Sequence, residues 1–232
     1  MKLENKSVMI STPCYQGLPY NDFTVALFRM FEYSKYVRKN DIEWIPVSGS
    51  NIYGIRNKTF KIFKESRFGS LLLIDNDMVF HESILECLFQ QDKDVIMPIF
   101  TNKAGNVYEI NKKIIPMATV KQKNGQLRQL TRGEIESQAD PMRIASNGFG
   151  MVLVKRRVIE EMTFPYCQGI CLPEFENTEN GVTGEDYYFC IEAIKKGFEI
   201  WLDPTLAIIH LGIKPYGIWD VNYEPVPQLL PA

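Results

Sequence analysis

The amino-acid sequence predicts an α/β protein whose mostly parallel central sheet is flanked by helices. Three observations lead to this fold class. Short apolar runs alternate with segments of helical periodicity over residues 7–97, which is the order of a parallel sheet with crossover helices. The run from Leu71 to Ile74 is apolar throughout, as expected of a strand that is covered on both faces. The same alternation of apolar runs and helical segments begins again at Met151.

The individual elements follow from these patterns. The strand over Ser7–Ser11 ends at Thr12-Pro13, and Asp22 is suited to cap the following helix. The buried positions of that helix are predicted to include Val25, Phe28, Met30 and Phe31. We expect further strands at Ile42–Val47, Ser70–Ile74, Val95–Met97, Met151–Val154, Glu199–Leu202 and Leu206–His210, and helices at Gly54–Ser66, His81–Gln90, Lys155–Met162 and Gly184–Lys196. Residues 100–145 and 164–183 lack a clear period and are expected to form hairpins and loops.

The composition is that of a globular protein. The 232 residues are 45% apolar and 23% charged, which fits a single domain over 1–232 with a Pro-rich tail at 215–232. The apolar runs have strand length and residues 1–6 lack the apolar core of a signal peptide, so we expect a cytoplasmic protein without stable membrane insertion. The net charge of −2 argues against bulk electrostatic binding of nucleic acid. The mildly basic segment Lys103–Arg132 nevertheless leaves DNA open as a partner.

Asp75-Asn76-Asp77 directly follows the buried strand. Ligands of open α/β sheets bind beyond the carboxyl ends of the strands, and residues i and i+2 of an extended chain point the same way. We therefore expect Asp75 and Asp77 to face one crevice. Two carboxylates repel a diphosphate unless a divalent cation lies between them, so the pair predicts a metal that binds phosphate oxygens on its other side. The alternative is that both acids only end a strand and cap a turn.

His210 is the second candidate metal ligand. It ends the apolar run Leu206–Ile209, and if this strand is a parallel neighbour, His210 reaches the same sheet edge as Asp77. An imidazole ligand favours manganese, Mn²⁺, over magnesium, Mg²⁺, which remains the other candidate. The alternative is a core histidine with satisfied ring nitrogens. His81, four residues past Asp77, competes for the ligand position but is expected to begin a helix.

Gly184-Glu185-Asp186 opens the last predicted helix. Asp186 lies on the apolar stripe of this helix, together with Phe189 and Ala193. An inward carboxylate at this position would accept the proton of an attacking hydroxyl as a general base. Thr183 to Asp186 also fits a capping box, and the two roles are compatible.

Three further segments carry weaker signals. Thr12-Pro13-Cys14-Tyr15 follows the first strand, where a loop would hold a nucleobase with Tyr15 stacked on it, or would be a plain surface loop. Arg56-Asn57 begins a helix, where the forked guanidinium suits a phosphate, although an exposed helix arginine is the more common case. Ser146-Asn147-Gly148-Phe149-Gly150 precedes a strand, and its glycines either let the backbone approach a sugar or mark a bulge.

In their order along the chain, these residues resemble the GT-A glycosyltransferases near family 2, and most of all the small single-domain enzymes of phages and bacteria. Ile74-Asp75-Asn76-Asp77-Met78, preceded by Arg56-Asn57, resembles the donor half of this family. Residues 146–150, Gly184-Glu185-Asp186 and the segment Trp201–Gly212 resemble the acceptor half. The resemblance covers about residues 7–214. It implies a Rossmann-like donor half at about 1–100 and an acceptor half with a smaller sheet at about 101–214.

The resemblance also implies an activity and residue roles. Such enzymes transfer a hexosyl or pentosyl group from a nucleotide-diphosphate sugar, with UDP as the default, to an acceptor hydroxyl. Their Asp-x-Asp motif holds the donor ribose and the metal, which falls on Asp75 and Asp77, and a late histidine, here His210, completes the metal site. The loop after the first strand binds the base. The pair Glu185-Asp186 would contact the acceptor and serve as the base in inverting members; the motifs leave inversion or retention open.

Two rival functions remain. Nucleotidyltransferases also use paired aspartates and a metal, but Gln16-Gly17-Leu18-Pro19 is a poor match for the Gly-rich basic loop that follows their first strand. A non-catalytic nucleotide-sugar-binding module would bind the donor without turning it over. For a transferase, the acceptor is a glycan, a lipid carrier, a small metabolite or a hydroxylated DNA base.

Overall fold

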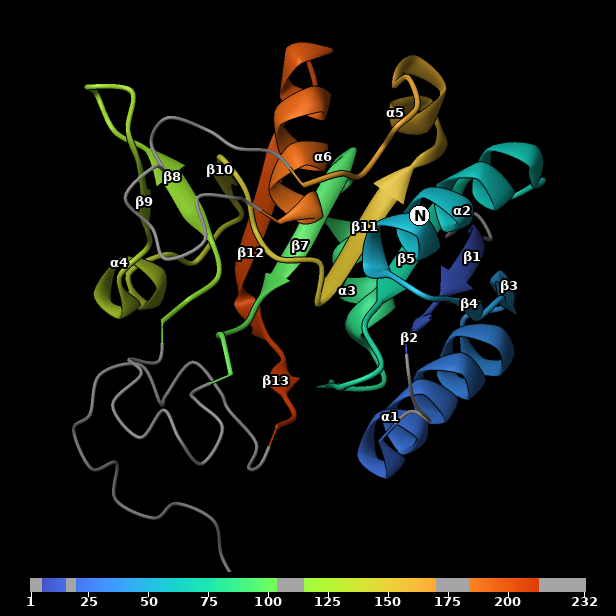
Figure 1. Cartoon of the computed structure of the whole chain (residues 1–232). Helices are drawn as coiled ribbons and strands as arrows, with labels where there is room; N and C mark the ends of the chain where they lie inside the picture. Colours follow the sequence, from blue (N-terminus) through green and yellow to red (C-terminus); the bar gives the residue numbers. More distant parts are fainter. Residues whose placement is uncertain (1–5, 16–19, 104–114, 170–183, 213–232) are drawn as a thin grey trace, which may run out of the picture.

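The fold is built on one large sheet. The computed structural model describes residues 6–15, 20–103, 115–169 and 184–212. Within these ranges seven strands form a sheet in the order β10-β12-β7-β11-β5-β1-β3 (Figure 1). These strands are β1 (Ser7–Ser11), β3 (Asp41–Trp44), β5 (Ser70–Ile74), β7 (Val95–Ile99), β10 (Met142–Ile144), β11 (Met151–Lys155) and β12 (Ile200–Ala207).

The sheet is mostly parallel, which confirms the predicted fold class. β1 pairs in parallel with both β3 and β5, and β7 pairs in parallel with β12. β11 lies antiparallel between β5 and β7, and β10 lies antiparallel to β12 at the edge. β11 and β10 therefore run against the other strands of the sheet. Because β7 lies between β11 and β12, the two predicted halves of the chain share one sheet.

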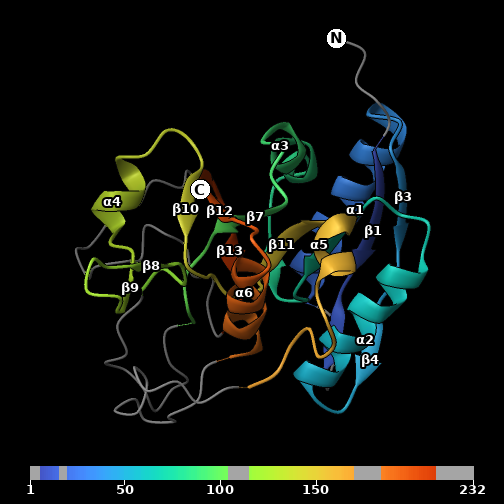
Figure 2. The ribbon, with the colours of Figure 1, turned by 90° about the horizontal axis from the view of Figure 1, so that it is seen from above.

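Helices cover both faces of the sheet. In Figure 2, α1 and α3 lie on one side of the strands, and α2, α5 and α6 lie on the other. A π-helical turn, η1, continues α1, and the short helix α4 lies beside a small hairpin at the β10 end of the sheet. The bounds are α1 (Asn21–Glu32), η1 (Tyr33–Val37), α2 (Ile52–Glu65), α3 (Ile84–Gln90), α4 (Arg132–Glu136), α5 (Arg156–Glu161) and α6 (Glu185–Lys195).

The apolar strand β5 shows why the chain forms three layers. All five of its residues are buried. Leu71 and Leu73 pack with the residues of α2, α5 and α6, whereas Leu72 and Ile74 pack with those of α1 and α3. Successive side chains of a strand point to opposite faces, so a continuous apolar run serves both cores, as predicted for this strand.

Helix α1 differs from its prediction. Its N-cap is Tyr20, and Asp22 lies in the first turn instead of capping the helix. Val25 and Phe28, predicted to be buried, are 50% and 59% exposed. The helix covers the sheet with a narrower stripe at spacings of three and four residues, Phe23, Ala26, Leu27 and Met30. Val25 and Phe28 lie outside this stripe and face solvent, whereas Phe31 is partly buried and packs against the same core.

Short ladders beyond the main sheet correct two predicted strands. These ladders use β2 (Pro13–Tyr15), β4 (Val47–Gly49), β6 (Met78–Val79), β8 (Thr119–Lys121), β9 (Leu127–Gln129) and β13 (Ile209–His210). The strand predicted over Ile42–Val47 is divided into β3 and β4, and β4 pairs with β2. The strand predicted over Leu206–His210 is also divided, because β12 continues to Ala207 and His210 belongs to β13. In the described ranges, no helix combines the length and apolarity needed to cross a bilayer.

Candidate active site

The candidate site lies where β1, β5 and β7 end and where α6 begins. These three strands run in one direction, so their carboxyl ends share one edge of the sheet. Asp75 follows β5, Thr101 and Lys103 follow β7, and Glu185 is the first residue of α6. The predicted site residues with carboxylate or imidazole groups come together at this edge.

Asp77 and His210 meet, but not through the strand pairing that the sequence suggested. β13 pairs antiparallel with β6, which places His210 opposite Met78, and the backbone N–H of Leu211 donates to the carbonyl oxygen of Asp77 at 2.7 Å. His210 Nε2 lies 3.5 Å from Asp77 Oδ2, and each side chain is 15% exposed. The expected proximity is confirmed. The expectation that His210 ends a parallel strand of the main sheet is wrong, because a separate antiparallel ladder brings it to Asp77.

The imidazole of His210 is held in one orientation. Its Nδ1 lies 2.9 Å from the carbonyl oxygen of Thr101, and the ring makes an edge contact with Phe100 at a centroid distance of 5.7 Å. A carbonyl only accepts hydrogen bonds, so this contact assigns a proton to Nδ1 and turns Nε2 toward Asp77. The imidazolium would donate from Nε2 to the carboxylate, whereas the neutral imidazole presents a lone pair there. A histidine oriented in this way by a backbone carbonyl has the arrangement of a metal ligand.

The donor atoms at Asp77 and His210 fit a divalent cation. Asp77 Oδ1 is buried and has no hydrogen-bond partner among the described residues, although buried polar atoms are normally paired. Burial raises the pKa of Asp77, but the hydrogen bonds and charges of His210 and Lys103 outweigh it and keep the pKa below its ordinary value. Asp77 is therefore a carboxylate at neutral pH. Across the described ranges no three His, Cys, Asp or Glu side chains are grouped as a metal site; the described candidates at this point are Asp77 and His210.

Lys103 is a member of the site that the sequence did not single out. Its ammonium donates to Asp77 Oδ2, the same oxygen that faces His210. The Lys103 side chain is 39% exposed. The only signal in the sequence is its position four residues after the end of β7, at the edge of the sheet where the acids gather.

Arg56 lies at the centre of the site, and both of its terminal guanidinium nitrogens donate to carboxylates. Its Nη2 donates to both carboxylate oxygens of Asp75 at 2.9 Å, and its Nη1 donates to Glu185. The side chain is only 4% exposed, and its guanidinium lies over the ring of Phe149 at 5.1 Å. Arg56 is therefore not an exposed helix arginine, and that alternative is wrong. The contacts also favour a structural role over direct phosphate binding, because Arg56 joins the carboxylate after β5 to the one that opens α6.

Asp75 shows the electrostatic cost of this arrangement. Burial raises its pKa; Arg56 opposes that effect and Asp77 adds to it, and the net result is a pKa above the ordinary value. Its backbone N–H donates to the carbonyl oxygen of Gly150 at 3.0 Å. Asp75 is thereby fixed by its backbone and by Arg56, while Asp77 carries the unpartnered oxygen.

Glu185 and Asp186 have different environments on α6. Glu185 is buried against Arg56. Asp186 accepts a hydrogen bond from the backbone N–H of Tyr187 at 2.8 Å, and burial followed by repulsion from Glu185 raises its pKa to about 6. The N-cap of α6 is Gly184, without a side-chain cap. Thr183, on which the predicted capping box depends, lies outside the described residues.

The segment before β11 is close-packed. A Cβ at Gly148 would lie 2.9 Å from Phe100 Cζ and 3.5 Å from Asp186 Oδ2, and one at Gly150 would lie 2.6 Å from Met78 Cε. Both glycines thus allow Phe100 and β6 to approach the backbone beside Asp186. Asn147 is fully buried, and its Nδ2 donates to the carbonyl oxygen of Pro98 at 3.2 Å, so its described contact is with the core instead of an open sugar site.

Two predicted binding segments have structural roles in the described contacts. Thr12 is buried and its Oγ1 accepts a hydrogen bond from Trp44 Nε1 at 3.1 Å. The segment Thr12-Pro13-Cys14-Tyr15 is not the loop that we expected, because β2 pairs in parallel with β4 there; the side chain of Tyr15 lies outside the described part. Asn57 accepts from the backbone N–H groups of Tyr166 and Cys167 at 2.8 and 3.1 Å, which fixes that loop to α2.

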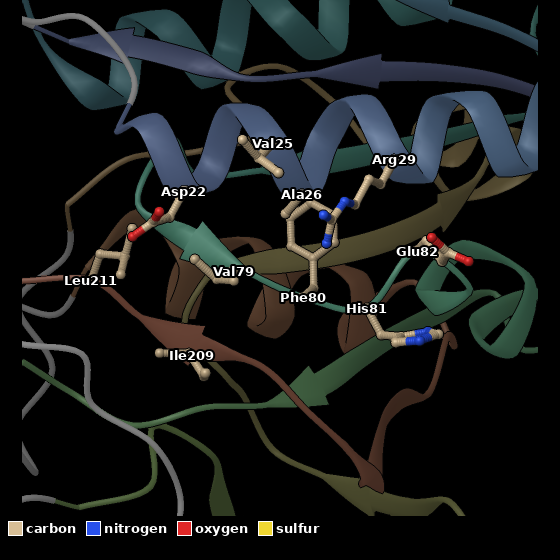
Figure 3. A pocket seen from close by; sticks show the side chains of 10 residues that line it. All are labelled: Asp22, Val25, Ala26, Arg29, Val79, Phe80, His81, Glu82, Ile209 and Leu211. Carbon is tan, nitrogen blue, oxygen red and sulfur yellow. The ribbon is translucent and has the colours of Figure 1, made fainter. Parts of the chain in front are cut away.

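Asn76 and His81 lie beside the Asp77–His210 pair. The carbonyl oxygen of Asn76 accepts from the backbone N–H of Tyr20 at 3.3 Å, which attaches the start of α1 to the acidic turn. His81 is exposed, and its Nδ1 lies 2.8 Å from Ser83 Oγ. Figure 3 shows it in the wall of a pocket between α1 and the β6–β13 ladder, with Ile209 also in the wall. His81 is therefore not the histidine at Asp77.

The fold and this edge define a mixed α/β protein with a Rossmann-like sheet whose carboxyl ends carry a cluster of acids, one buried arginine and one oriented histidine. Among solved structures, the chain is similar to A197 from STIV, with 17% sequence identity, a TM-score of 0.52, and coverage of 89% of this chain and 86% of that one. At this identity the likeness establishes the fold alone. No family model and no curated protein matches the chain.

Proposed function

We propose that the protein is a metal-dependent glycosyltransferase that moves a sugar from a nucleotide-diphosphate sugar to an acceptor hydroxyl. The single observation that carries this proposal is the meeting of Asp77 and His210 at the sheet edge, with an unpartnered carboxylate oxygen and an oriented Nε2 atom. The Rossmann-like sheet and the resemblance of the motifs to GT-A enzymes support the same assignment. A UDP-sugar is the proposed donor, on the resemblance.

Asp77 and His210 would hold the cation, with phosphate oxygens of the donor filling positions that the chain does not supply. A bound divalent cation supplies charge stabilisation to the diphosphate that leaves when the anomeric bond breaks. The imidazole ligand favours Mn²⁺ over Mg²⁺. Asp75, next to Asp77 and fixed by Arg56, would accept a hydrogen bond from the donor ribose.

Asp186 is the proposed general base. Its raised pKa of about 6 makes it a stronger base than an ordinary aspartate, while it is still largely ionised at pH 7. It would take the proton of the acceptor hydroxyl as that oxygen attacks the anomeric carbon. This role applies to an inverting enzyme. Glu185 would not take this proton, because its carboxylate is paired with Arg56.

The acceptor is proposed to be a hydroxyl-bearing molecule, and the charges near the predicted basic segment bear on its class. Arg128 pairs with Glu134, and Arg132 pairs with Glu136. These two arginines are therefore partly neutralised within their own segment, which reduces the support for modified DNA as an acceptor. A glycan, a lipid carrier or a small metabolite places no such demand on surface charge.

A thermal-shift panel of nucleotide sugars with and without Mn²⁺ tests the proposal. A ligand at 100 times its Kd stabilises the native state by about 2.7 kcal/mol, which for a chain of this size is a rise in Tm of about 5–10 °C. We expect such a rise for a UDP-sugar with Mn²⁺ and a much smaller one with a chelator. If no nucleotide sugar shifts the Tm in either condition, the proposed donor site is wrong.

The same panel, followed by product analysis, separates the rival functions. A nucleotidyltransferase would be stabilised by a nucleoside triphosphate and would release pyrophosphate in the presence of a sugar phosphate. A non-catalytic binding module would be stabilised by the nucleotide sugar and would release no nucleoside diphosphate on long incubation. Slow hydrolysis of the donor without an acceptor would support the transferase.

The pKa of Asp186 predicts opposite effects on activity and stability. Replacing Asp186 by asparagine should abolish most transfer at every pH, and the wild-type rate should fall about tenfold per pH unit below pH 6. Because the folded pKa is raised, the carboxyl costs no stability below its unfolded pKa, and the cost develops as pH rises through about 6. Asp186→Asn should therefore raise the Tm at pH 8 but not at pH 4.

A pH–rate profile and denaturation at two pH values measure both effects. Full activity of Asp186→Asn would exclude Asp186 as the base. A lower Tm of this variant at pH 8 would show that the carboxylate is stabilised by contacts instead of being strained by burial and by Glu185.

A further inference from the structure

Lys103 and His210 converge on one oxygen atom of Asp77. The ammonium of Lys103 donates to Asp77 Oδ2, and His210 Nε2 faces the same oxygen at 3.5 Å. Asp77 Oδ1 has no partner among the described residues. The backbone segment that carries Lys103 also positions the histidine, because His210 Nδ1 contacts the carbonyl oxygen of Thr101, two residues before Lys103.

The two cations of the site differ in how firmly they are held. Arg56 is 4% exposed and bridges Asp75 and Glu185, so its charge is committed to those two carboxylates. Lys103 is 39% exposed, and its one ion pair within the described ranges is with Asp77. A lysine carries a point charge on a flexible four-carbon stem, and exposed ion pairs are weak. The lysine is therefore the exchangeable cation, and the arginine is the fixed one.

The geometry points to Lys103 as a resident cation that neutralises Asp77 in the absence of metal and that a divalent cation must displace. This inference rests on the proposed function, because it takes Asp77 and His210 as metal ligands. A metal ion held between Asp77 and His210 would lie at Oδ2, the oxygen that faces Nε2. At this range it would repel the ammonium that already occupies Oδ2, so the two cations compete for this oxygen. The consequence is a site whose affinity for free metal is reduced by one of its own side chains.

The test is the Kd for Mn²⁺ alone, measured at fixed pH and an ionic strength of about 0.15 M from the EPR signal of free Mn²⁺. Removing the competing charge in Lys103→Gln should lower the Kd by about tenfold. Lys103→Arg keeps the charge and should bind close to the wild-type value. Lys121→Gln removes the same charge from an exposed position on β8 and should bind within about twofold of wild type, since distant exposed charges are screened.

A double variant links the gain to Asp77. Asp77→Asn in the Lys103→Gln background should lose the tighter binding, because the freed carboxylate is its source. If Lys103→Gln binds Mn²⁺ no more tightly than wild type, the proposed competition between Lys103 and the metal is wrong, while the proposed metal site is unaffected. If neither wild type nor Lys103→Gln binds Mn²⁺, the proposed metal site itself fails, and this inference fails with it. Lys103 is partly exposed, so an unchanged Tm should confirm that the variant is folded.

Discussion

Replacing Asp77 by asparagine is expected to reduce sugar transfer about 100- to 1000-fold, with little loss of stability. The asparagine keeps the shape of the side chain but removes the negative charge that the proposed cation between Asp77 and His210 requires. The lost ion pair with Lys103 involves a partly exposed lysine, so we expect it to cost less than about 1 kcal/mol. Steady-state transfer with Mn²⁺ and a thermal melt measure the two effects.

The chain offers a matched control for this variant. It has two histidines, and His81 is exposed and hydrogen-bonded to Ser83, away from Asp77. His210→Ala should therefore resemble Asp77→Asn, while His81→Ala should retain wild-type transfer and metal dependence. Near-native turnover of Asp77→Asn in the presence of a chelator would refute the metal site.

Replacing Arg56 by methionine is expected to give the largest loss of stability, about 3–5 kcal/mol. The substitution leaves Asp75 and Glu185 facing each other in a buried site without the cation that joins them. Arg56→Lys should be intermediate, because an ammonium lacks the fork that binds both carboxylates. Chemical denaturation at pH 7 gives the free energies of unfolding.

The pH dependence of Arg56→Met has a definite sign. Without the arginine, whose charge lowers the pKa of Asp75, the folded pKa of Asp75 should rise further above its unfolded value. The added cost is absent below the unfolded pKa and develops as pH rises through the folded one. The difference in the free energy of unfolding between wild type and Arg56→Met should therefore become smaller as the pH falls from 8 to 4.

An exposed arginine provides the control for Arg56→Met. Arg67 pairs with Asp41 at the surface, and its side chain is 62% exposed. Arg67→Met should cost less than about 1 kcal/mol. An equally small cost for Arg56→Met would mean that Asp75 and Glu185 do not depend on the arginine.

The sheet could be predicted because its strands have local signals. The apolar run of β5 and the alternation of strands and helices survive in the structure almost as expected. The buried face of a helix was less predictable, because Val25 and Phe28 of α1 are apolar yet exposed. Hydrophobicity shows that a residue is suited to the core, but the rotation of a helix against the sheet decides which apolar residues reach it.

The sequence alone determined the α/β class and selected Asp77, His210 and Asp186 as residues of one site, because acids and a histidine after apolar strands stand out from their surroundings. Only the tertiary structure decided how they are joined: an antiparallel ladder brings His210 to Asp77, and Arg56 is a buried bridge between two carboxylates. The pairing partner of a short ladder and the second partner of a long side chain depend on contacts between distant segments. Such contacts have no local periodicity, so the residues themselves do not reveal them.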